Sequence, residues 1–421
     1  MELKSQAKLL QDFLLETQKI WEYEIMDYYP KSLEHFNPQW LEILANLPLE
    51  KLHQIESKKV IPEIIGTGLD HWIEKIHTLI TVDKITSIPA KNLEDWAYVD
   101  VKAKKKHEID RLAPFIEKLA VEQKFDNMID IGGGVGHLAR IIAHYYSLPV
   151  TTLDMDKNFQ SIGLKRALKY RMPREAKQLE FLNLKFGDHE GNQQLKKYFK
   201  QKTLTFGLHT CGPLAISLIE THQECNGTAL INFGCCYHKL AADNKFPFSA
   251  YYKSYNQLHY TLNAYTLATR AHGVTSFDEF KLKTQVKNYR QALHLLLMQK
   301  FNHADILDVG EVHTREYTMP FSQYALSRLK ALQLPHALSA DELDAFFASE
   351  EIKSILKQML AANVIRWMLG RCLEIYLLID RVCYLEELGH EVKLLEFFDE
   401  NISPRNLGIV AIKKGAREAP F

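Results

Sequence analysis

This sequence has few cysteines, no long apolar run and no net charge, and each shortage excludes a class of protein. Six cysteines in 421 residues are too few for a disulfide framework, and two of them, Cys235 and Cys236, are adjacent. No apolar run reaches the roughly 18 residues of a membrane-spanning helix, and the N-terminal segment lacks the apolar core of a signal peptide. Lysine plus arginine and aspartate plus glutamate both total 52, which argues against a surface that coats nucleic acid throughout. We expect a soluble, reduced, cytoplasmic protein without membrane contact.

The chain divides into four segments by its hydrophobic pattern. Residues 1–95 have helical periodicity and no cluster of reactive side chains, so we expect a helical cap or a surface for a protein partner. In residues 96–247 strands alternate with helices, which predicts a mostly parallel, doubly wound α/β sheet. Residues 248–388 are mainly helical. Residues 389–421 contain two final strands that we expect to pair at one edge of the sheet.

The periodicity also predicts individual elements. The expected strands cover residues 127–131, 150–153, 203–208, 228–233, 391–397 and 407–413, and a further strand is expected to end near Asp188. The expected helices include residues 104–122, 157–180, 251–267, 282–300 and 355–388, and one helix that begins at His137.

A glycine-rich turn lies between an expected strand and an expected helix. It reads Asp130-Ile-Gly132-Gly133-Gly134-Val-Gly136-His137, and its D-x-G-x-G-x-G spacing is typical of S-adenosylmethionine (SAM) enzymes rather than of dinucleotide binding. Asp154 follows 24 residues after Asp130, at the end of the next strand, where a carboxylate can hold the ribose hydroxyls of an adenosine. We expect Asp188, beyond a third strand, to accept a hydrogen bond from the adenine amino group. The alternatives are a nicotinamide cofactor or a turn without a ligand.

Cysteines and histidines cluster after two further strands. The fourth strand ends in His209-Thr-Cys211-Gly-Pro, and the fifth strand ends in Cys235-Cys236-Tyr237-His238. In a doubly wound sheet these strand ends meet at one edge, where ligands bind. The residues can form a substrate pocket, in which His209 or His238 takes a proton and Tyr237 contacts the acceptor. They can hold zinc, although the spacing is not the usual C-x₂-C pairing and we expect no metal. They can also be buried structural residues.

The sequence resembles a family of SAM-dependent methyltransferases that includes the methyltransferase-like 25 proteins and the ribosomal RNA adenine dimethylase domain-containing proteins. The tRNA acceptor-stem ribose methyltransferases have related cofactor motifs and a similar Cys-Cys-His run. The matching stretches are Lys104-Lys-Lys-His-Glu108, DIGGGVGHLAR (130–140), GLHTCGPLA (207–215), NFGCCYHKL (232–240), FPFS (246–249), YRQAL (289–293), DRVCYLEELG (380–389) and SPRNL (403–407). The family name that contains "adenine dimethylase" does not establish that chemistry.

The resemblance implies a Rossmann-like class I methyltransferase fold. We expect a seven-stranded, mostly parallel sheet with an antiparallel edge hairpin, an N-terminal helical region and a large helical insertion before the last two strands. The cofactor is expected to be SAM. We assign cofactor binding to Glu108, Asp130, Gly132, Gly133, Gly134, Gly136, His137, Asp154, Met155, Asp188, His189 and His209. We assign catalysis to His209, Cys211, Cys235, Cys236, Tyr237 and His238, and substrate binding to Lys106, Arg405 and Asn406.

The charge distribution suggests RNA as the methyl acceptor. Residues 157–202 contain 12 lysines and arginines against 4 acidic residues, although the whole chain is neutral. The members that we expect to share a helix and its exit are Lys165, Arg166, Lys169, Arg171, Arg174 and Lys177. The helical insertion adds Arg270, Lys281, Lys283, Lys287 and Arg290. A protein acceptor and a non-catalytic SAM-binding protein are the alternatives.

Overall fold

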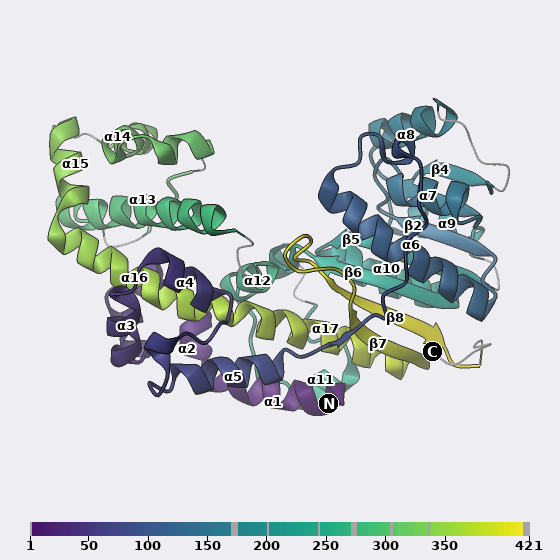
Figure 1. Ribbon diagram of the computed structural model, residues 1–421, viewed down its shortest axis with the longest axis horizontal. Coiled ribbons are helices and arrows are strands. Elements are labelled where there is room, and N and C mark those ends of the chain that lie inside the picture. The colour runs from purple at the N-terminus through teal and green to yellow at the C-terminus, as the bar shows by residue number, and fades with distance from the viewer. Residues whose placement is uncertain are drawn as a thin grey trace. The chain divides into compact units, whose positions relative to one another are not determined.

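The computed structural model describes residues 2–169, 176–199, 202–242, 245–270, 276–303, 306–310, 312–334 and 337–415, with only the backbone of His189. The chain forms two compact units, and Figure 1 labels the helices and strands of both. We call them the sheet unit (residues 1–12, 81–269 and 374–421) and the helical unit (residues 13–80 and 270–373). In the described ranges, no helix is both long enough and apolar enough to cross a membrane.

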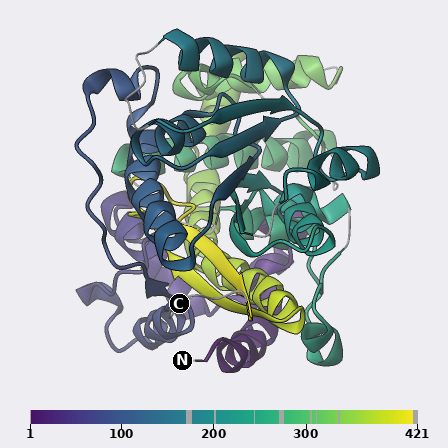
Figure 2. The same ribbon diagram turned by 90° about the vertical axis from the view of Figure 1, so that its right-hand side faces the viewer.

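The sheet unit is built on one sheet, whose described strands follow the order β1-β7-β8-β6-β5-β2-β3-β4. They are β1 (Asp83–Lys84), β2 (Asn127–Ile131), β3 (Val150–Asp154), β4 (Leu179–Asn183), β5 (Thr203–Cys211), β6 (Ala229–Cys235), β7 (His390–Glu396) and β8 (Leu407–Lys413). Within this set, β8 alone runs against the others. The yellow C-terminal strands lie in the same sheet as the blue and teal strands (Figure 2). The predicted Rossmann-like α/β fold is confirmed.

Helices pack on this sheet and join its parallel strands. The α-helices of the sheet unit are α6 (Ala103–Gln123), α7 (His137–Tyr145), α8 (Lys157–Lys169), α9 (His189–Lys196), α10 (Pro213–Glu224), α11 (Ala250–Tyr255), α12 (Leu262–Thr269) and most of α17 (Gly370–Glu387), with the start of α1 (Leu3–Glu16). The short 3₁₀ helices of this unit are η4 (Asp95–Tyr98) and η5 (Tyr237–Ala242). Helix α7 contacts β3, and α10 contacts β5 and β6.

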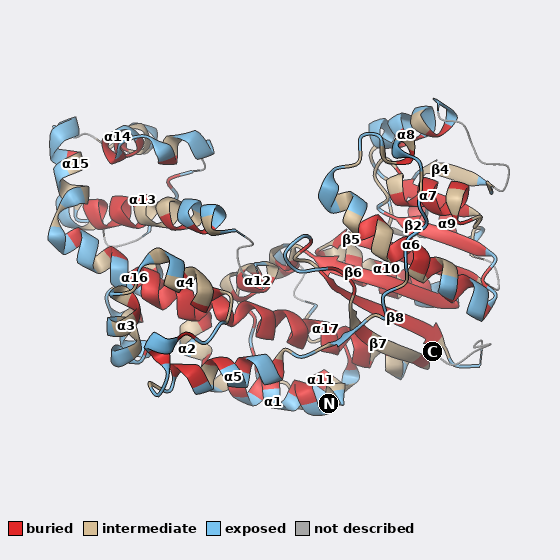
Figure 3. Cartoon of the chain, in the orientation of Figure 1, coloured by how far each residue is buried: buried red, intermediate tan, exposed pale blue. Residues whose placement is uncertain are grey.

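The core of the sheet unit lies between one face of the sheet and helices α6 and α7. Alternate residues of neighbouring strands supply it, including Leu204 and Phe206 on β5 and Ile231 and Phe233 on β6. Strand β2 is buried at all its positions, which is the pattern of a central parallel strand with both faces covered (Figure 3). This core holds the ends of the central strands in fixed positions.

Two details of the predicted sheet are wrong. The structure adds strand β1, which pairs parallel with β7, so the β7–β8 hairpin is not the outermost part of the sheet. A two-residue strand has no period that a sequence pattern can show. The helix expected over residues 157–180 ends at Lys169, and β4 begins at Leu179 because its backbone pairs with β3. Residues 170–175 lie outside the described part of the chain.

The helical unit combines helices from both ends of the sequence. Its α-helices are α2 (Gln18–Trp21), α3 (Pro38–Ala45), α4 (Leu49–Glu56), α5 (Leu69–Leu79), α13 (Phe277–Phe301), α14 (Phe321–Ala331), α15 (Ala340–Ala348) and α16 (Glu350–Met368), and it includes the end of α1. Its described 3₁₀ helices are η1 (Ile25–Tyr28), η2 (Lys31–His35), η3 (Pro62–Ile64) and η6 (Thr314–Thr318).

Ion pairs and packing join the N-terminal helices to the insertion within the helical unit. Glu24 contacts Arg366 at 3.1 Å and Lys287 at 3.0 Å, and Glu56 contacts Lys283 at 2.7 Å. The Lys283 ammonium also lies 3.5 Å from the centre of the Trp367 ring. The unit boundaries therefore differ from the four predicted segments, since packing groups residues 13–80 with residues 270–373.

A buried histidine in the sheet unit makes stability depend on pH. His222 on α10 is fully buried, and its ring nitrogens have no hydrogen-bond partner among the described residues. Burial lowers the pKa of His222 to about 3, so the folded state keeps the ring neutral. The unfolded chain binds this proton near pH 6.5, so the stabilisation is present above about pH 6.5 and is lost as the pH falls.

We predict that His222→Phe reduces this acid sensitivity. Between about pH 6.5 and about pH 5.5, the free energy of unfolding of the native chain should fall by about 1 kcal/mol more than that of the variant. Urea unfolding followed by circular dichroism measures both. His35→Phe, at an exposed histidine, is the control and should decline in parallel with the native chain. A parallel decline of His222→Phe would contradict the assignment.

Candidate active site

The carboxyl ends of the parallel strands meet at one edge of the sheet, and most of the predicted site residues lie there. Asp130 is on β2, Asp154 ends β3, Cys211 ends β5 and Cys235 ends β6. The pairing of β3 with β2, β2 with β5 and β5 with β6 places these four ends side by side. This edge is where doubly wound sheets bind their ligands.

The glycine turn after β2 has a backbone that other residues adopt with difficulty. Gly132, Gly134 and Gly136 have φ angles of +68°, +60° and +68°, in the left-handed region. Gly136 immediately precedes α7, and a Cβ on it would lie 2.7 Å from Phe181 Cε1. A Cβ on Gly133 would lie 2.4 Å from Asp130 Oδ2, whereas one on Gly134 would meet nothing within 4 Å. The turn therefore favours glycine at Gly132, Gly134 and Gly136 because of their backbone conformation. It favours glycine at Gly133 and Gly136 because a side chain there would clash with its neighbours.

Two carboxylates hold this turn. Asp154 Oδ2 accepts a hydrogen bond from the Gly134 amide at 3.0 Å, and its Oδ1 accepts one from the Asp156 amide at 2.9 Å. Asp130 Oδ2 accepts a hydrogen bond from Thr152 Oγ1 at 3.0 Å. Burial raises the pKa of Asp130 to about 7. Met155, next to Asp154, is 71% exposed at the same edge.

The other predicted cofactor residues have contacts of their own. Asp188 lies beyond the end of β4 and caps α9 by accepting a hydrogen bond from the Gly191 amide at 2.8 Å. The His189 side chain lies outside the described part of the chain. His137 Nε2 lies 3.3 Å from the Arg166 guanidinium, and burial together with that charge lowers the pKa of His137 to about 4. Ligand binding by these residues stays a prediction.

A β-bulge in β5 sets the register of the cysteines. Gly207 pairs with Asn232, but Thr210 pairs with Gly234, so β5 contains one extra residue between these pairs. Without this extra residue, Cys211 would lie opposite Cys236; with it, Cys211 lies opposite Cys235. Gly207 permits the bulge, since a Cβ there would lie 2.4 Å from Thr210 Cγ2.

The residues around the bulge explain the H-T-C-G motif. Thr210 Oγ1 donates to the Phe233 carbonyl at 2.9 Å, and the Gly212 amide donates to the Cys235 carbonyl at 2.7 Å. Gly212 has a φ of +54°, and a Cβ on it would lie 2.6 Å from Lys239 Cβ. The threonine and the glycine therefore hold the ends of β5 and β6 together.

A buried carboxylate fixes the remaining residue of this motif, His209. Glu108 on α6 has a fully buried side chain, and its Oε2 lies 3.1 Å from His209 Nε2. Its Oε1 accepts a hydrogen bond from Ser403 Oγ at 2.7 Å, and Lys105 Nζ lies 2.7 Å from Oε2. Burial alone would raise the pKa of Glu108, but the hydrogen bond from His209 and the charge of Lys105 hold it well below its usual range. The carboxylate is therefore ionised.

This pairing determines which nitrogen of His209 can accept a proton. An ionised carboxylate only accepts hydrogen bonds, so Nε2 carries the hydrogen that faces Glu108. In a neutral imidazole Nδ1 is then the acceptor, and the His209 side chain is 31% exposed. A histidine oriented by a carboxylate is the arrangement of a general base.

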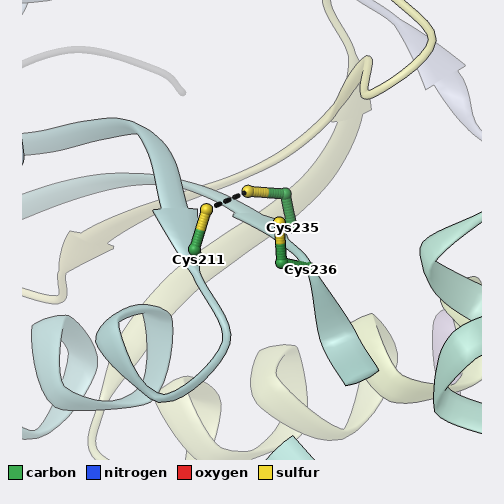
Figure 4. A group of neighbouring side chains, drawn as sticks. All are labelled: Cys211, Cys235 and Cys236. Atoms are coloured by element: carbon green, nitrogen blue, oxygen red, sulfur yellow. Dashed lines mark hydrogen bonds between the residues drawn. The ribbon is translucent and has the colours of Figure 1, made fainter. Parts of the chain in front are cut away.

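Three thiols gather beside this histidine. Cys211 Sγ lies 3.1 Å from Cys235 Sγ, and the sulfurs of Cys211, Cys235 and Cys236 all lie within 4.8 Å of one another (Figure 4). All three are free thiols. The hydrogen bond from Cys235 holds the pKa of Cys211 below its usual range, while burial and Cys211 itself raise the pKa of Cys235.

Two predicted catalytic residues are held by contacts with other elements of the sheet unit. Tyr237 is 2% exposed, and its hydroxyl lies 3.1 Å from both the Gly234 carbonyl oxygen and Glu374 Oε1. The ring therefore belongs to the core, and its expected contact with an acceptor stays a prediction. His238 Nδ1 lies 3.3 Å from Thr269 Oγ1, so this histidine is tied to the end of α12.

The predicted substrate residues are corrected in part. Asn406 is fully buried and donates to the Phe398 carbonyl, so it supports its loop instead of facing a substrate. Lys106 Nζ pairs with Asp110 at 2.6 Å and lies over the Tyr98 ring. Arg405 is partly exposed, and its Nε is buried without a hydrogen-bond partner among the described residues.

The sequence analysis did not single out Lys105 or Ser403, although both contact Glu108. Lys105 lies in a run of three lysines, and only helix geometry tells it apart from its neighbours. Ser403 is distant from Glu108 in the sequence, and their contact exists only because the β7–β8 loop packs against α6. The signal that the sequence did contain was the SPRN motif itself.

We predict that the glycines of the turn differ in their tolerance of alanine. Gly133→Ala forces a methyl group against Asp130 and Thr152 and should cost about 3 kcal/mol, whereas Gly134→Ala bears only the backbone strain of about 1 kcal/mol. Thermal unfolding of both variants measures the difference. Equal losses of stability would show that the crowding at Gly133 is absent in solution.

Comparison with known proteins finds similarity to methyltransferases. Residues 104–243 match a sequence family described as a methyltransferase domain. The "Probable methyltransferase-like protein 25" of Mus musculus is 27% identical over 228 residues, and its Homo sapiens counterpart is 27% identical over 229 residues. Each match covers 50% of this chain and 37% of the relative. Residues 104–243 are thus similar to a methyltransferase domain, and half of the chain is similar to part of the methyltransferase-like 25 proteins.

Proposed function

We propose that this chain is a SAM-dependent methyltransferase whose acceptor is RNA. The observation that carries the proposal is the position of the Glu108–His209 pair. It lies at the same edge of the sheet as the glycine turn, so a proton acceptor and a cofactor cradle belong to one site. The methyltransferase domain match covers both parts.

The residues at the strand ends suit an adenosine with a charged tail. Asp154 would hold the ribose hydroxyls, and Gly132 to Gly136 would bring backbone amides close to the ligand. Met155 presents an exposed apolar side chain next to Asp154, where an adenine ring would pack. Asp188 would accept from the adenine amino group through the oxygen that does not cap α9.

His209 would prepare the acceptor for methylation. SAM supplies a methyl group on a sulfonium sulfur, and the transfer is an in-line displacement that needs no nucleophile from the protein. A ribose hydroxyl must lose its proton, which His209 Nδ1 can take while Glu108 stabilises the resulting imidazolium. A base nitrogen with a free lone pair needs only positioning.

The RNA assignment rests on the charge of α8 and the segment after it. Lys157, Lys165 and Lys169 are exposed on α8, together with Phe159 at 46%. Exposed lysines suit the phosphates of RNA, and an exposed aromatic ring on the same helix suits an unstacked base. Arg171 and Arg174 lie outside the described part of the chain.

The basic residues expected in the helical insertion support RNA binding less than the sequence suggests. Lys283 and Lys287 pair with Glu56 and Glu24 inside the helical unit, and Lys281 pairs with Asp278 at 2.7 Å. These lysines stabilise the helical unit.

We predict that Asp154→Asn weakens SAM binding about 100-fold, because two hydrogen bonds to an ionised carboxylate are lost. Isothermal titration calorimetry with SAM measures the dissociation constant. Asp156→Asn, which changes a neighbouring carboxylate, is the matched control and should bind normally. An unchanged dissociation constant for Asp154→Asn would rule out the ribose assignment.

The acceptor is tested by labelled methyl transfer from SAM into an extract of cells that lack this chain. We expect label that ribonuclease removes and protease leaves. Glu108→Gln and His209→Ala should lower the rate about 100-fold or more if the acceptor is a hydroxyl. His71→Ala, whose side chain is 78% exposed in the helical unit, should not change it.

Other outcomes of this assay would overturn either the RNA acceptor or the catalytic activity. Label sensitive to protease alone would make the acceptor a protein and discard the RNA assignment. Binding of SAM without any label in RNA or protein would favour a non-catalytic binding protein.

A further inference from the structure

We propose that Cys211, Cys235 and Cys236 form a binding site for one zinc ion at the edge of the sheet. This inference does not depend on the identity of the methyl acceptor. It revises the sequence-based expectation of no metal, which relied on the unusual spacing of the cysteines. Spacing is a poor guide here, because the ligands come from the ends of two strands and the pairing of β5 with β6 brings them together.

The geometry of the thiols suits a small thiophilic cation. Zinc binds thiolates at about 2.3 Å, which places tetrahedral sulfur ligands about 3.8 Å apart. The sulfurs of the three cysteines lie within 4.8 Å of one another, and the pair Cys211 and Cys235 lies 3.1 Å apart. The required separation falls inside this range, so small side-chain rotations are enough to bind the ion.

The backbone conformation of Cys236 also brings its thiol toward the other two. Successive side chains of a strand point to opposite faces, so Cys235 and Cys236 would separate if β6 continued. Cys236 instead has a φ of +52°, in the left-handed region that residues with a Cβ seldom adopt. The turn ends β6 and brings the second thiol to the side of the first (Figure 4). Such strain is concentrated at functional sites.

Two basic side chains complement a zinc thiolate centre. Three thiolates with one divalent ion have a net charge of −1. Lys239 is next to the cluster, since its amide donates to the Cys236 carbonyl at 3.0 Å, and the charge of Arg405 acts on Cys235 and Cys236. The Arg405 Nε is buried and has no hydrogen-bond partner among the described residues, so it can donate to a metal-bound thiolate.

The site leaves one coordination position open. Three protein ligands with a free fourth position are typical of zinc sites that contact water or substrate, whereas structural sites have four protein ligands. Cys235 is buried, but Cys211 and Cys236 are partly exposed, so an ion can enter from the edge of the sheet. The open position lies beside the strand ends at which we place the methyl acceptor.

The test is zinc binding by the full chain, kept reduced with a phosphine rather than a thiol. We expect one zinc ion per chain in competition with a metallochromic dye. Cobalt(II) added to the metal-free chain should give a sulfur-to-metal charge-transfer band. Cys211→Ser and Cys236→Ser should each weaken zinc binding about 100-fold or more, since loss of even an outer-shell partner costs 10- to 100-fold.

Cys225→Ser provides the matched control. Cys225 is also a partly exposed free thiol, but it follows α10 and lies outside the cluster, so this variant should bind zinc and cobalt like the native chain. Circular dichroism and SAM titration of the same variants report the fold and cofactor binding separately. A variant that keeps both and loses zinc supports the site even if no methyl transfer is found.

Two results would overturn the proposal. One is a reduced, folded chain that binds no zinc and gives no cobalt charge-transfer band. The other is zinc binding that Cys211→Ser and Cys236→Ser leave unchanged.

Discussion

The buried carboxylate of Glu108 joins three segments that lie far apart in the sequence. It binds Lys105 on its own helix, His209 on β5 and Ser403 in the loop between β7 and β8. An ionised carboxylate without solvent is costly unless its oxygens are paired, so each of these partners is needed for the others to stay in place. The orientation of His209, and with it the chemistry proposed for the site, follows from this one group.

The bulge in β5 acts on the same region in a different way. It adds one residue between Gly207 and Thr210, and every side chain beyond it changes its partner on β6. Cys211 therefore lies opposite Cys235 instead of Cys236.

The sequence predicted the sheet unit well because its signals are local. Alternating strands and helices, the glycine spacing and the acids at strand ends each depend on a few neighbouring residues. The Rossmann-like fold and the methyltransferase domain were found from them. The sequence did not reveal that Tyr237 and Asn406 are buried, since a reactive residue type next to a motif does not show whether its side chain faces the core or the solvent. It also failed for Lys283 and Lys287, whose partners lie more than 200 residues away.

The amino-acid pattern alone was sufficient for the alternation of strands and helices in the sheet unit and for the position of the glycine turn. Those features arise from backbone preferences and from periodic burial, which neighbouring residues specify. Folding decided which residues act together. The register across β5 and β6, the burial of Glu108 and the packing of residues 13–80 with the insertion all depend on contacts between distant segments. No local pattern encodes them, because the energy of such a contact exists only when both partners are in place.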